Sequence, residues 1–222
     1  MTTDRDYAPT GRTVPTRYRE RARYDRATVH AILDEALICH LGFVGEGGPV
    51  VLPTIHARLG EVLYLHGSTG SHPMLAASDA PDGLPVCVTA TLVDGLVLAR
   101  SWLHHSLEFR SVVVVGNARP VRDDAEKRRA LAAVVDHVMP GRAADSRPPN
   151  SRELAATAVL ALDLVEVSAK VRTGGPVDDD DDLRLPHWAG VLPLSLQPGS
   201  PVPADDLDAI PPPSYLVDYR RG

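Results

Sequence analysis

Cysteine is scarce in this chain: the only two, Cys39 and Cys87, each lie inside an apolar run. Two such residues cannot build the disulfide framework of a small secreted protein, so we expect two buried thiols without a redox role. Long apolar runs are also missing, and residues 1–12 are polar and charged, unlike a signal peptide. These absences predict a cytoplasmic protein that does not enter the membrane.

An excess of positive charge is missing as well. The chain has 23 Lys and Arg against 29 Asp and Glu, a net charge of −6. Nucleic-acid binding normally needs a clustered basic face, so this balance argues against that class of partner. Residues 17–26 contain five arginines, but Glu20 and Asp25 interrupt them. We interpret this segment as the solvated entry to a helix.

The common catalytic motifs are absent. Ser68 does not lie in a Gly-x-Ser-x-Gly elbow, and the chain has neither a Gly-Lys-Ser/Thr phosphate loop nor a Gly-x-Gly-x-x-Gly turn after a strand. The histidines lack the ligand spacing of a zinc site, and the acidic run 178–182 lacks the spacing of a calcium loop. We therefore predict no metal site, and no residue stands out as a catalytic acid or base.

The apolar pattern predicts a mainly β fold with flanking helices. Closely spaced antiparallel strands, without long helical crossovers, favour a barrel over a doubly wound sheet. Asp94-Gly95 is a typical two-residue hairpin turn between two such strands. The expected helices are 27–36, 73–78 and 123–138, and the expected strands are 38–44, 50–59, 61–66, 84–93, 96–101, 112–121 and 159–171.

Composition divides the chain into three parts. Residues 1–22 form a polar arm, and residues 23–173 carry the barrel pattern. Residues 174–222 are acidic and then rich in proline, which predicts a tail that wraps over the barrel in extended form. Trp188 is a large aromatic residue in this otherwise polar tail, so we expect it to be buried against the barrel, a partner or a ligand.

Two segments are candidates for ligand binding. In residues 63–74 an apolar strand ends in small and hydroxyl residues and a helix begins near Ser71, an arrangement that favours a phosphate group. The same residues also suit a plain strand–turn–helix connection. Arg110 lies at the start of a buried strand, where it could meet an anionic ligand or an electron-rich ring. The alternative is a salt bridge to Glu108 or another carboxylate.

Four motifs, in order along residues 23–193, resemble one known family. They are residues 49–54 (PVVLPT), residues 64–68 (YLHGS) with Ser71, residues 98–116 and residues 188–193 (WAGVLP). Together they resemble the pyridoxamine 5′-phosphate oxidase-like flavoproteins, and within them the branch of nitroimidazole-reductase-type proteins. The resemblance implies an FMN-binding split β-barrel that forms a homodimer, with an FMN in each of two grooves between the subunits.

The resemblance also implies roles for individual residues. A loop would bind the FMN phosphate, a strand would run along the isoalloxazine ring, a second strand would reach the flavin, and a tryptophan would close the pocket, from the other subunit. In this order the residues are His66, Gly67, Ser68, Ser71 and His72; Pro53 and Thr54; Arg110 and Ser111; and Trp188.

The sequence departs from the family pattern at two of these places. His72 stands where relatives commonly have Arg or Lys, and Phe109 stands where Tyr is common. The charge-assisted contact to the phosphate is then weaker. Lys170 and Arg172, at the end of the last long strand, could supply the missing positive charge.

The leading hypothesis is an FMN-dependent oxidoreductase that passes hydride or electrons to a small organic acceptor, with a nicotinamide as candidate donor. Pyridoxamine phosphate oxidation itself is disfavoured, because no basic cluster beyond Arg110 is visible for the phosphate of that substrate. Other hypotheses stay open: a haem-binding barrel with His66, His72 or His104 as axial ligand, a deazaflavin-binding protein, a flavin-binding module without turnover, and a purely structural dimer.

Overall fold

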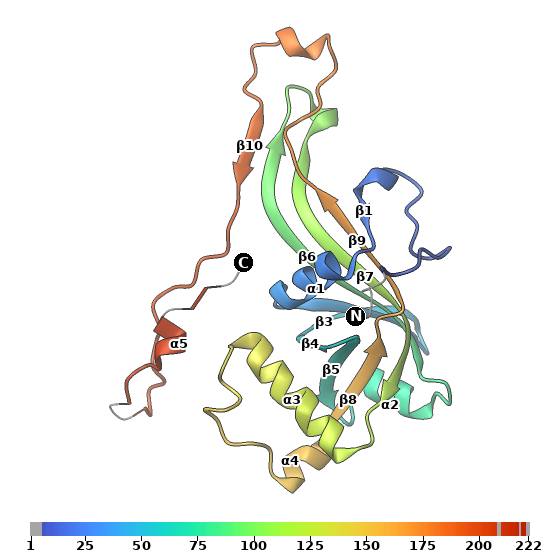
Figure 1. Cartoon of the computed structure of the whole chain (residues 1–222), viewed down its shortest axis with the longest axis vertical. Helices are drawn as coiled ribbons and strands as arrows, with labels where there is room; N and C mark the ends of the chain where they lie inside the picture. Colours follow the sequence, from blue (N-terminus) through green and yellow to red (C-terminus); the bar gives the residue numbers. More distant parts are fainter. Residues whose placement is uncertain (1–5, 208–209, 218, 221–222) are drawn as a thin grey trace, which may run out of the picture.

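The computed structural model describes residues 6–207, 210–217 and 219–220. Its centre is one antiparallel sheet in the order β3-β2-β6-β7-β8-β5-β4, with β9 also paired to β7, β1 to β9 and β10 to β6 (Figure 1). The strands are β1 (Ala22–Arg23), β2 (Cys39–Gly45), β3 (Gly48–Thr54), β4 (His56–Leu59), β5 (Val62–Ser68), β6 (Leu84–Leu98), β7 (Ser106–Pro120), β8 (Thr157–Asp163), β9 (Glu166–Arg172) and β10 (Gly190–Pro193). The prediction of a mainly β fold with flanking helices is confirmed.

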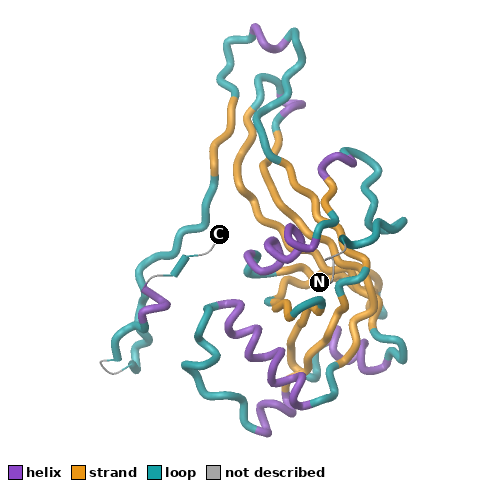
Figure 2. The backbone as a smooth tube through the Cα atoms, viewed as in Figure 1, coloured by secondary structure: helices purple, strands orange, loops and turns teal. Residues whose placement is uncertain are grey.

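The helices mostly lie around the middle and lower parts of the sheet, and the C-terminal one lies in the tail, away from it (Figure 2). They are α1 (Arg26–Glu35), α2 (His72–Asp79), α3 (Asp124–Val138), α4 (Ser151–Ala156) and α5 (Ser214–Val217), with short 3₁₀ turns η1 (Arg19–Arg21), η2 (Trp102–His104) and η3 (Asp182–Arg184). The two long predicted helices form where expected because each has an aspartate N-cap. Asp25 accepts a hydrogen bond from Thr28 N, and Asp123 accepts one from Glu126 N.

The predicted hairpin at Asp94-Gly95 is wrong. Strand β6 runs straight through this pair with a bulge between Val93 and Gly95, and the chain reverses only at η2. Two neighbours override the local turn preference. Arg110 holds the Asp94 carboxylate, and β10 packs so closely on Gly95 that a Cβ there would lie 3.2 Å from the Leu192 carbonyl oxygen. The result is a long β6–β7 arm, the upright hairpin of Figure 1.

Two predicted long strands are each divided in the structure. The expected strand 50–59 breaks at Ile55 into β3 and β4, which join different partners, β2 and β5. The expected strand 159–171 breaks at Leu164-Val165 into β8 and β9, which pair with different parts of β7. Apolar alternation continues across both breaks, so the pattern alone could not reveal them.

The core lies between the curved sheet and helix α1. Ile32, Leu33, Leu63 and Leu162 are at most 1% exposed. The N-terminal arm joins this core through Tyr7, whose hydroxyl donates to Glu61 Oε2 at 2.7 Å and lies 3.0 Å from His30 Nε2. Cys39 is buried as predicted, but Cys87 is exposed on the opposite face of the sheet, which corrects the expectation of two buried thiols.

The tail leaves the barrel after β10 and runs down beside it (Figure 1). Hydrogen bonds from Leu194 and Tyr215 tie it to the rest of the chain. Leu194 N donates to the Asp94 carbonyl, and Tyr215 donates to Asp145 at 2.6 Å. Trp188 is 67% exposed, so the structure does not bury it in its own subunit.

None of the helices in the described part of the chain has the length and apolar character needed to cross a membrane.

We expect the fold to lose stability in acid. Arg119 lowers the pKa of Glu126 through a hydrogen bond, and Thr28 does the same for Asp25. Burial alone would raise the pKa of Glu61, but hydrogen bonds from Tyr7 and Arg26 outweigh it and lower that pKa. Because these pKa values are lower in the folded state, their stabilisation is present above about pH 4.5 and is lost as the pH falls through the folded values.

Thermal melts at pH 6 and pH 3.5 measure this effect. The melting temperature should be lower at pH 3.5, by several degrees or more. The variant Glu126→Gln should show a smaller difference between the two pH values than the wild type. An equal difference in both proteins would mean that Glu126 does not contribute.

Candidate functional site

The loop between β5 and α2 is folded tightly on itself. Ser71 N and Ser71 Oγ both donate to the Ser68 carbonyl, at 2.9 and 2.8 Å, and Gly70 N donates to Ser68 Oγ at 3.4 Å. Helix α2 begins directly afterwards, with Pro73 in its first turn. A helix N-terminus carries partial positive charge, so this loop suits an anionic group.

His66 and Gly67, at the end of β5, lie beside this loop. Burial lowers the pKa of His66, so its imidazole is neutral at pH 7, and its buried Nδ1 has no hydrogen-bond partner among the described residues. At Gly67 a Cβ would lie 3.2 Å from Ser71 Oγ and 3.2 Å from Met74 Cε. Glycine is therefore what lets the end of β5 pass this close to α2.

His72 lies at the edge of the loop, against the end of β2. Its exposed ring packs edge-on to Phe43, with the centroids 6.5 Å apart, and its Cε1 lies 3.7 Å from the position of a Cβ on Gly45. The structure thus brings five of the predicted residues together in one place: His66, Gly67, Ser68, Ser71 and His72. Their contact with a phosphate stays a prediction.

Pro53 and Thr54 lie on β3, which ends the order of the sheet in the described part of the chain. Pro53 is exposed and lies opposite His40 of β2. Val51 and Leu52 beside it are 63% and 38% exposed. An edge strand with apolar side chains and open backbone groups can accept a ring or a second chain.

Arg110 takes part in a charge cluster inside the molecule. Its guanidinium donates to both oxygens of Asp94, at 2.8 and 2.9 Å, and to both oxygens of Glu35, at 2.5 and 2.8 Å. These hydrogen bonds raise the pKa of Arg110 above its usual range. In this structure Arg110 therefore forms salt bridges, which was one of the two sequence-based alternatives. Its partners are Glu35 and Asp94 rather than Glu108. Glu108 instead accepts a hydrogen bond from Gly174 N at 2.6 Å.

The Arg110 cluster opens into a cavity of about 520 Å³ between α1, β6 and the tail. Its apolar wall includes Leu37, Leu92 and Leu196. Contact between Arg110 and a flavin stays a prediction, and so does contact from Ser111, which faces the other side of the sheet opposite Thr91 and Lys170.

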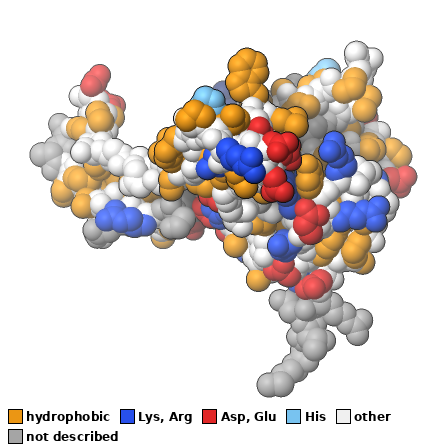
Figure 3. Space-filling view, turned by 90° about the horizontal axis from the view of Figure 1, so that it is seen from above, with side chains coloured by type: hydrophobic (Ala, Val, Ile, Leu, Met, Phe, Trp, Pro, Cys, Tyr) orange, Lys and Arg blue, Asp and Glu red, His pale blue; other side chains and the backbone are white. Residues whose placement is uncertain are grey.

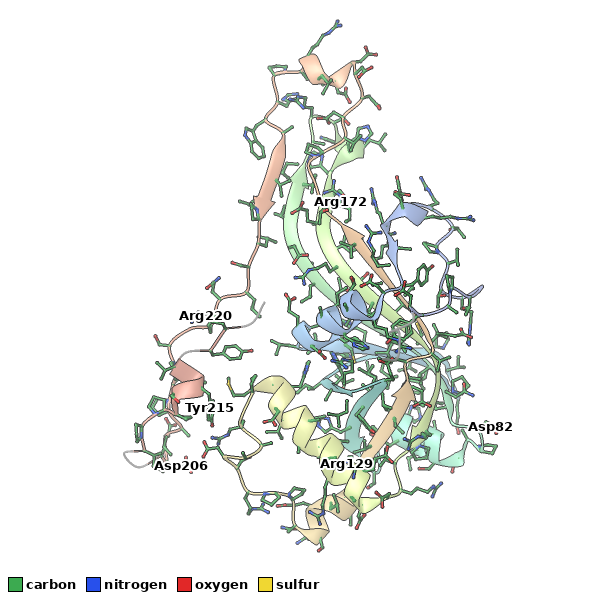
Figure 4. The ribbon with its side chains drawn as sticks, in the orientation of Figure 1. Asp82, Arg129, Arg172, Asp206, Tyr215 and Arg220 are labelled. Atoms are coloured by element: carbon green, nitrogen blue, oxygen red, sulfur yellow. The ribbon has the colours of Figure 1, made fainter. Side chains whose placement is uncertain are left out.

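Lys170 and Arg172, the residues expected to supply positive charge in place of the missing cation at His72, have different environments. Lys170 is half-buried on β9, opposite Ser111 and Ala22. Arg172 is only 6% exposed, and its guanidinium donates to the carbonyls of Gly174 and Gly175. Arg172 therefore organises the loop after β9 in this structure (labelled in Figure 4).

At the end of the β6–β7 arm, the acidic run 178–182 contacts Arg100 and His104. Arg100 forms a hydrogen-bonded ion pair with Asp178, whose side chain is 1% exposed. His104 Nε2 lies 3.2 Å from Asp179 Oδ2. A carboxylate oxygen of Asp182 lies within 4.8 Å of both groups. The acidic run is thus partly docked on η2 rather than wholly solvated. Trp102 is 96% exposed there, and Figure 3 shows the hydrophobic and charged side chains that share this end.

Sequence reasoning missed His40. Its neighbours Cys39 and Leu41 are buried, while His40 points to the other face and is exposed. Only the strand register reveals that this imidazole lies beside Pro53, between β3 and β6. The signal in the sequence was a single polar residue in the apolar run 38–44.

Comparison with known proteins identifies the family. Residues 25–171 match the pyridoxamine 5′-phosphate oxidase family. The chain belongs to this family. Its sheet is accordingly the split barrel of pyridoxamine 5′-phosphate oxidase-like proteins, as the resemblance predicted. No curated protein matches the sequence.

Two solved structures are similar over nearly the whole chain. The flavocytochrome Anf3 from Azotobacter vinelandii is 40% identical, with a TM-score of 0.89 over 97% of this chain and 100% of that one. An FAD- and haem-binding protein from Mycobacterium smegmatis is 37% identical, with a TM-score of 0.82 over 89% of this chain and 96% of that one.

A third structure shares the fold at a greater distance. It is a putative 5-nitroimidazole antibiotic resistance protein from Bacteroides thetaiotaomicron, 20% identical, with a TM-score of 0.56 over 68% of this chain and 86% of that one. This structure is therefore less similar to the chain than the two FAD- or haem-related structures are.

Proposed function

We propose that this protein binds a flavin and a haem and passes electrons between them, as a flavocytochrome of the pyridoxamine 5′-phosphate oxidase family. One observation supports this most strongly. The two similar structures described as a flavocytochrome and as an FAD- and haem-binding protein match 97% and 89% of the chain. The family match ends at residue 171, so the 97% match must include most of the tail.

The residues fit a flavin. The loop from Ser68 to His72 offers hydroxyls and a helix N-terminus to a phosphate group, and the orphaned Nδ1 of His66 offers a further polar contact. Gly67 keeps the space beside the loop open. The exposed edge of β3 at Pro53 and Thr54 can lie along an aromatic ring system.

The identity of the flavin differs from the sequence-based expectation. The family resemblance implied FMN, whereas the Mycobacterium smegmatis protein is described as binding FAD. We therefore propose FAD. FAD carries a second phosphate and an adenosine, and His72, at the place where relatives carry a cation, makes a weak anchor for a single terminal phosphate.

Bound flavin supplies one- and two-electron chemistry, and haem supplies one-electron chemistry. The chain's own residues hold and orient the rings. The β5–α2 loop would hold the phosphate end, the neutral His66 would donate or accept a hydrogen bond without adding charge, and the β3 edge would lie against the ring. A small-molecule acceptor and a nicotinamide donor remain part of this proposal, as does turnover itself.

A homodimer is part of the same proposal. Five strands, β3, β2, β6, β7 and β9, share a face turned away from the core, which we call the outer face. Val44, Val51 and Val93 on it are 72%, 63% and 45% exposed. Exposed apolar side chains on a sheet face favour contact with another protein surface. A second copy would cover it and place Trp188 near the flavin of its partner.

Purified full-length protein tests the proposal directly. We expect an absorption spectrum with flavin bands and a sharp Soret band, FAD on chromatographic analysis of the released flavin, and a dimer by sedimentation. Flavin bands that bleach anaerobically on addition of a nicotinamide would support turnover. A colourless protein that takes up neither FAD nor haem would contradict the proposal, and would favour a deazaflavin or a structural role.

A further inference from the structure

The end of the β6–β7 arm carries a group of metal-ligating side chains that the proposed function does not use. The loop after β9 crosses the end of the arm, so that residues 178–182 meet the turn 100–104 (Figure 1). There His104 Nε2 lies 3.2 Å from Asp179 Oδ2. These two atoms and a carboxylate oxygen of Asp182 all lie within 4.8 Å of one another. One imidazole and two carboxylates thus converge from segments that are far apart in the sequence.

An ion pair holds the two segments in this arrangement. The Asp178 carboxylate is only 1% exposed, and it accepts hydrogen bonds from Arg100 N at 2.9 Å and from the Arg100 guanidinium at 2.7 Å. This pair neutralises the first carboxylate of the acidic run and places the second, Asp179, beside His104. Residues 179–182 are four further aspartates, which leave an excess of negative charge at the end of the arm.

Buried polar atoms without hydrogen bonds gather in the same turn. Among the described residues, Arg100 Nε, Ser101 Oγ and His104 Nε2 are buried and have no hydrogen-bond partner. The contact of His104 Nε2 with Asp179 is close enough for an ion pair but does not have the geometry of a hydrogen bond. Buried polar groups nearly always bond to protein, to water or to an ion. Three exceptions within five consecutive residues indicate that this turn is built around a bound group.

The donor atoms indicate the class of ion. Calcium and magnesium take oxygen ligands, so an imidazole nitrogen disfavours both. Zinc and similar transition metals bind imidazole together with carboxylates. Ligand atoms at about 2.1 Å from such an ion lie about 3–4 Å apart, so the cluster closes around it with a movement of about 1 Å. The Asp179 side chain is 74% exposed and is free to make that movement.

We propose that His104, Asp179 and Asp182 bind a divalent transition-metal ion of the zinc type, which clamps residues 178–184 onto the end of the arm. Water completes the coordination of the ion. The site is independent of the proposed flavin and haem. It differs from the sequence-based prediction of no metal site, because the ligands come together only when the loop after β9 folds across η2.

Titration calorimetry with ZnCl₂ tests the site, on full-length, tag-free protein freed of metal with EDTA. We expect the wild type to bind one Zn²⁺ per chain, and His104→Ala and Asp179→Asn to bind it at least tenfold more weakly. Asp180→Asn is the matched control, since Asp180 is an exposed carboxylate of the same run outside the cluster, and we expect its affinity to equal that of the wild type. MgCl₂ should give no binding heat.

Three outcomes of this titration would overturn the inference. The first is a wild-type protein that binds no zinc. The second is equal zinc affinity in the wild type and His104→Ala, which would place the ion elsewhere. The third is an equal loss of affinity in Asp180→Asn and Asp179→Asn, which would mean that the run attracts zinc only by its charge. The flavin and haem content of the wild type bears on the proposed function alone.

Limited digestion with trypsin tests the clamp. Arg184 is exposed at the end of η3, so zinc should slow cleavage after Arg184 severalfold in the wild type and have no effect in His104→Ala. Cleavage after the exposed Arg142, between α3 and α4, is the internal control. Equal protection of Arg184 by zinc in the wild type and in His104→Ala would contradict the clamp.

A further variant guards against a folding defect in His104→Ala. His104→Cys retains a zinc ligand, so we expect it to keep the zinc affinity and the protection of Arg184. With Co²⁺ in place of Zn²⁺ it should also show a thiolate-to-cobalt absorption band that the wild type lacks. A folded His104→Cys protein that binds neither ion would overturn the inference.

Discussion

Replacing Arg110 with alanine is expected to destabilise the fold by about 3 kcal/mol. Arg110 on β7 joins Glu35 at the end of α1 to Asp94 at the bulge of β6 through four hydrogen bonds. The two carboxylates are 23% and 30% exposed, so without the guanidinium they would face each other only partly hydrated. Breaking such a pair on one side costs more than the pair contributes, because the remaining charges stay in place.

Urea unfolding of wild type and Arg110→Ala measures this effect. The variants Glu35→Gln and Asp94→Asn are the matched controls, since each leaves Arg110 with one carboxylate, and we expect each to lose about 1 kcal/mol. A change below about 0.5 kcal/mol in Arg110→Ala would contradict the structural role. A folded Arg110→Ala protein that no longer binds flavin would instead support the sequence-based prediction of a flavin contact.

Replacing Gly67 with valine is expected to weaken flavin binding at least tenfold, or about 1.4 kcal/mol. A Cβ at this position would already lie 3.2 Å from Ser71 Oγ and from Met74 Cε, and the two methyl groups of valine extend further toward the loop. The first turn of α2 must then move away from the phosphate site. The Ser71–Ser68 hydrogen bonds that shape the loop would be strained or lost.

Gly70→Val is the matched control, because a Cβ at Gly70 meets nothing within 4 Å and the residue lies in the same loop. Flavin affinity is measured by fluorescence quenching on titration of FAD into the apoprotein, and folding by circular dichroism. Equal affinity in the two variants would show that the loop does not hold the phosphate. If Gly67→Val unfolds, the smaller change Gly67→Ala tests the same crowding.

Much of the local structure could be predicted from the sequence. Asp25 and Asp123 start α1 and α3 because an aspartate side chain can accept from the backbone two or three residues on, whatever the rest of the fold does. The β5–α2 loop was also predictable, since small and hydroxyl residues followed by Ser-His-Pro end a strand and begin a helix. Four motifs along one stretch of chain were enough to identify the family.

Other features depended on partners distant in sequence. Asp94-Gly95 reads as a hairpin turn, yet Arg110, 16 residues away, and Leu192, close to a hundred residues away, keep β6 continuous there. Arg110 could have met a ligand or a carboxylate. Glu35, 75 residues earlier, decides between these only when α1 packs against β7. Distant charges cannot be paired from sequence, because many carboxylates are equally plausible until the fold excludes most of them.

The sequence by itself determined the β-rich class, the positions of the main helices, the family and the turn between β5 and α2, because each depends on neighbouring residues or on a contiguous motif. Only the tertiary structure decided that the arm is a single long hairpin, that Arg110 is neutralised by two carboxylates, and that His40 stands exposed beside Pro53. Strand register and the direction of side chains arise when separate segments pair, and local sequence carries no record of that pairing.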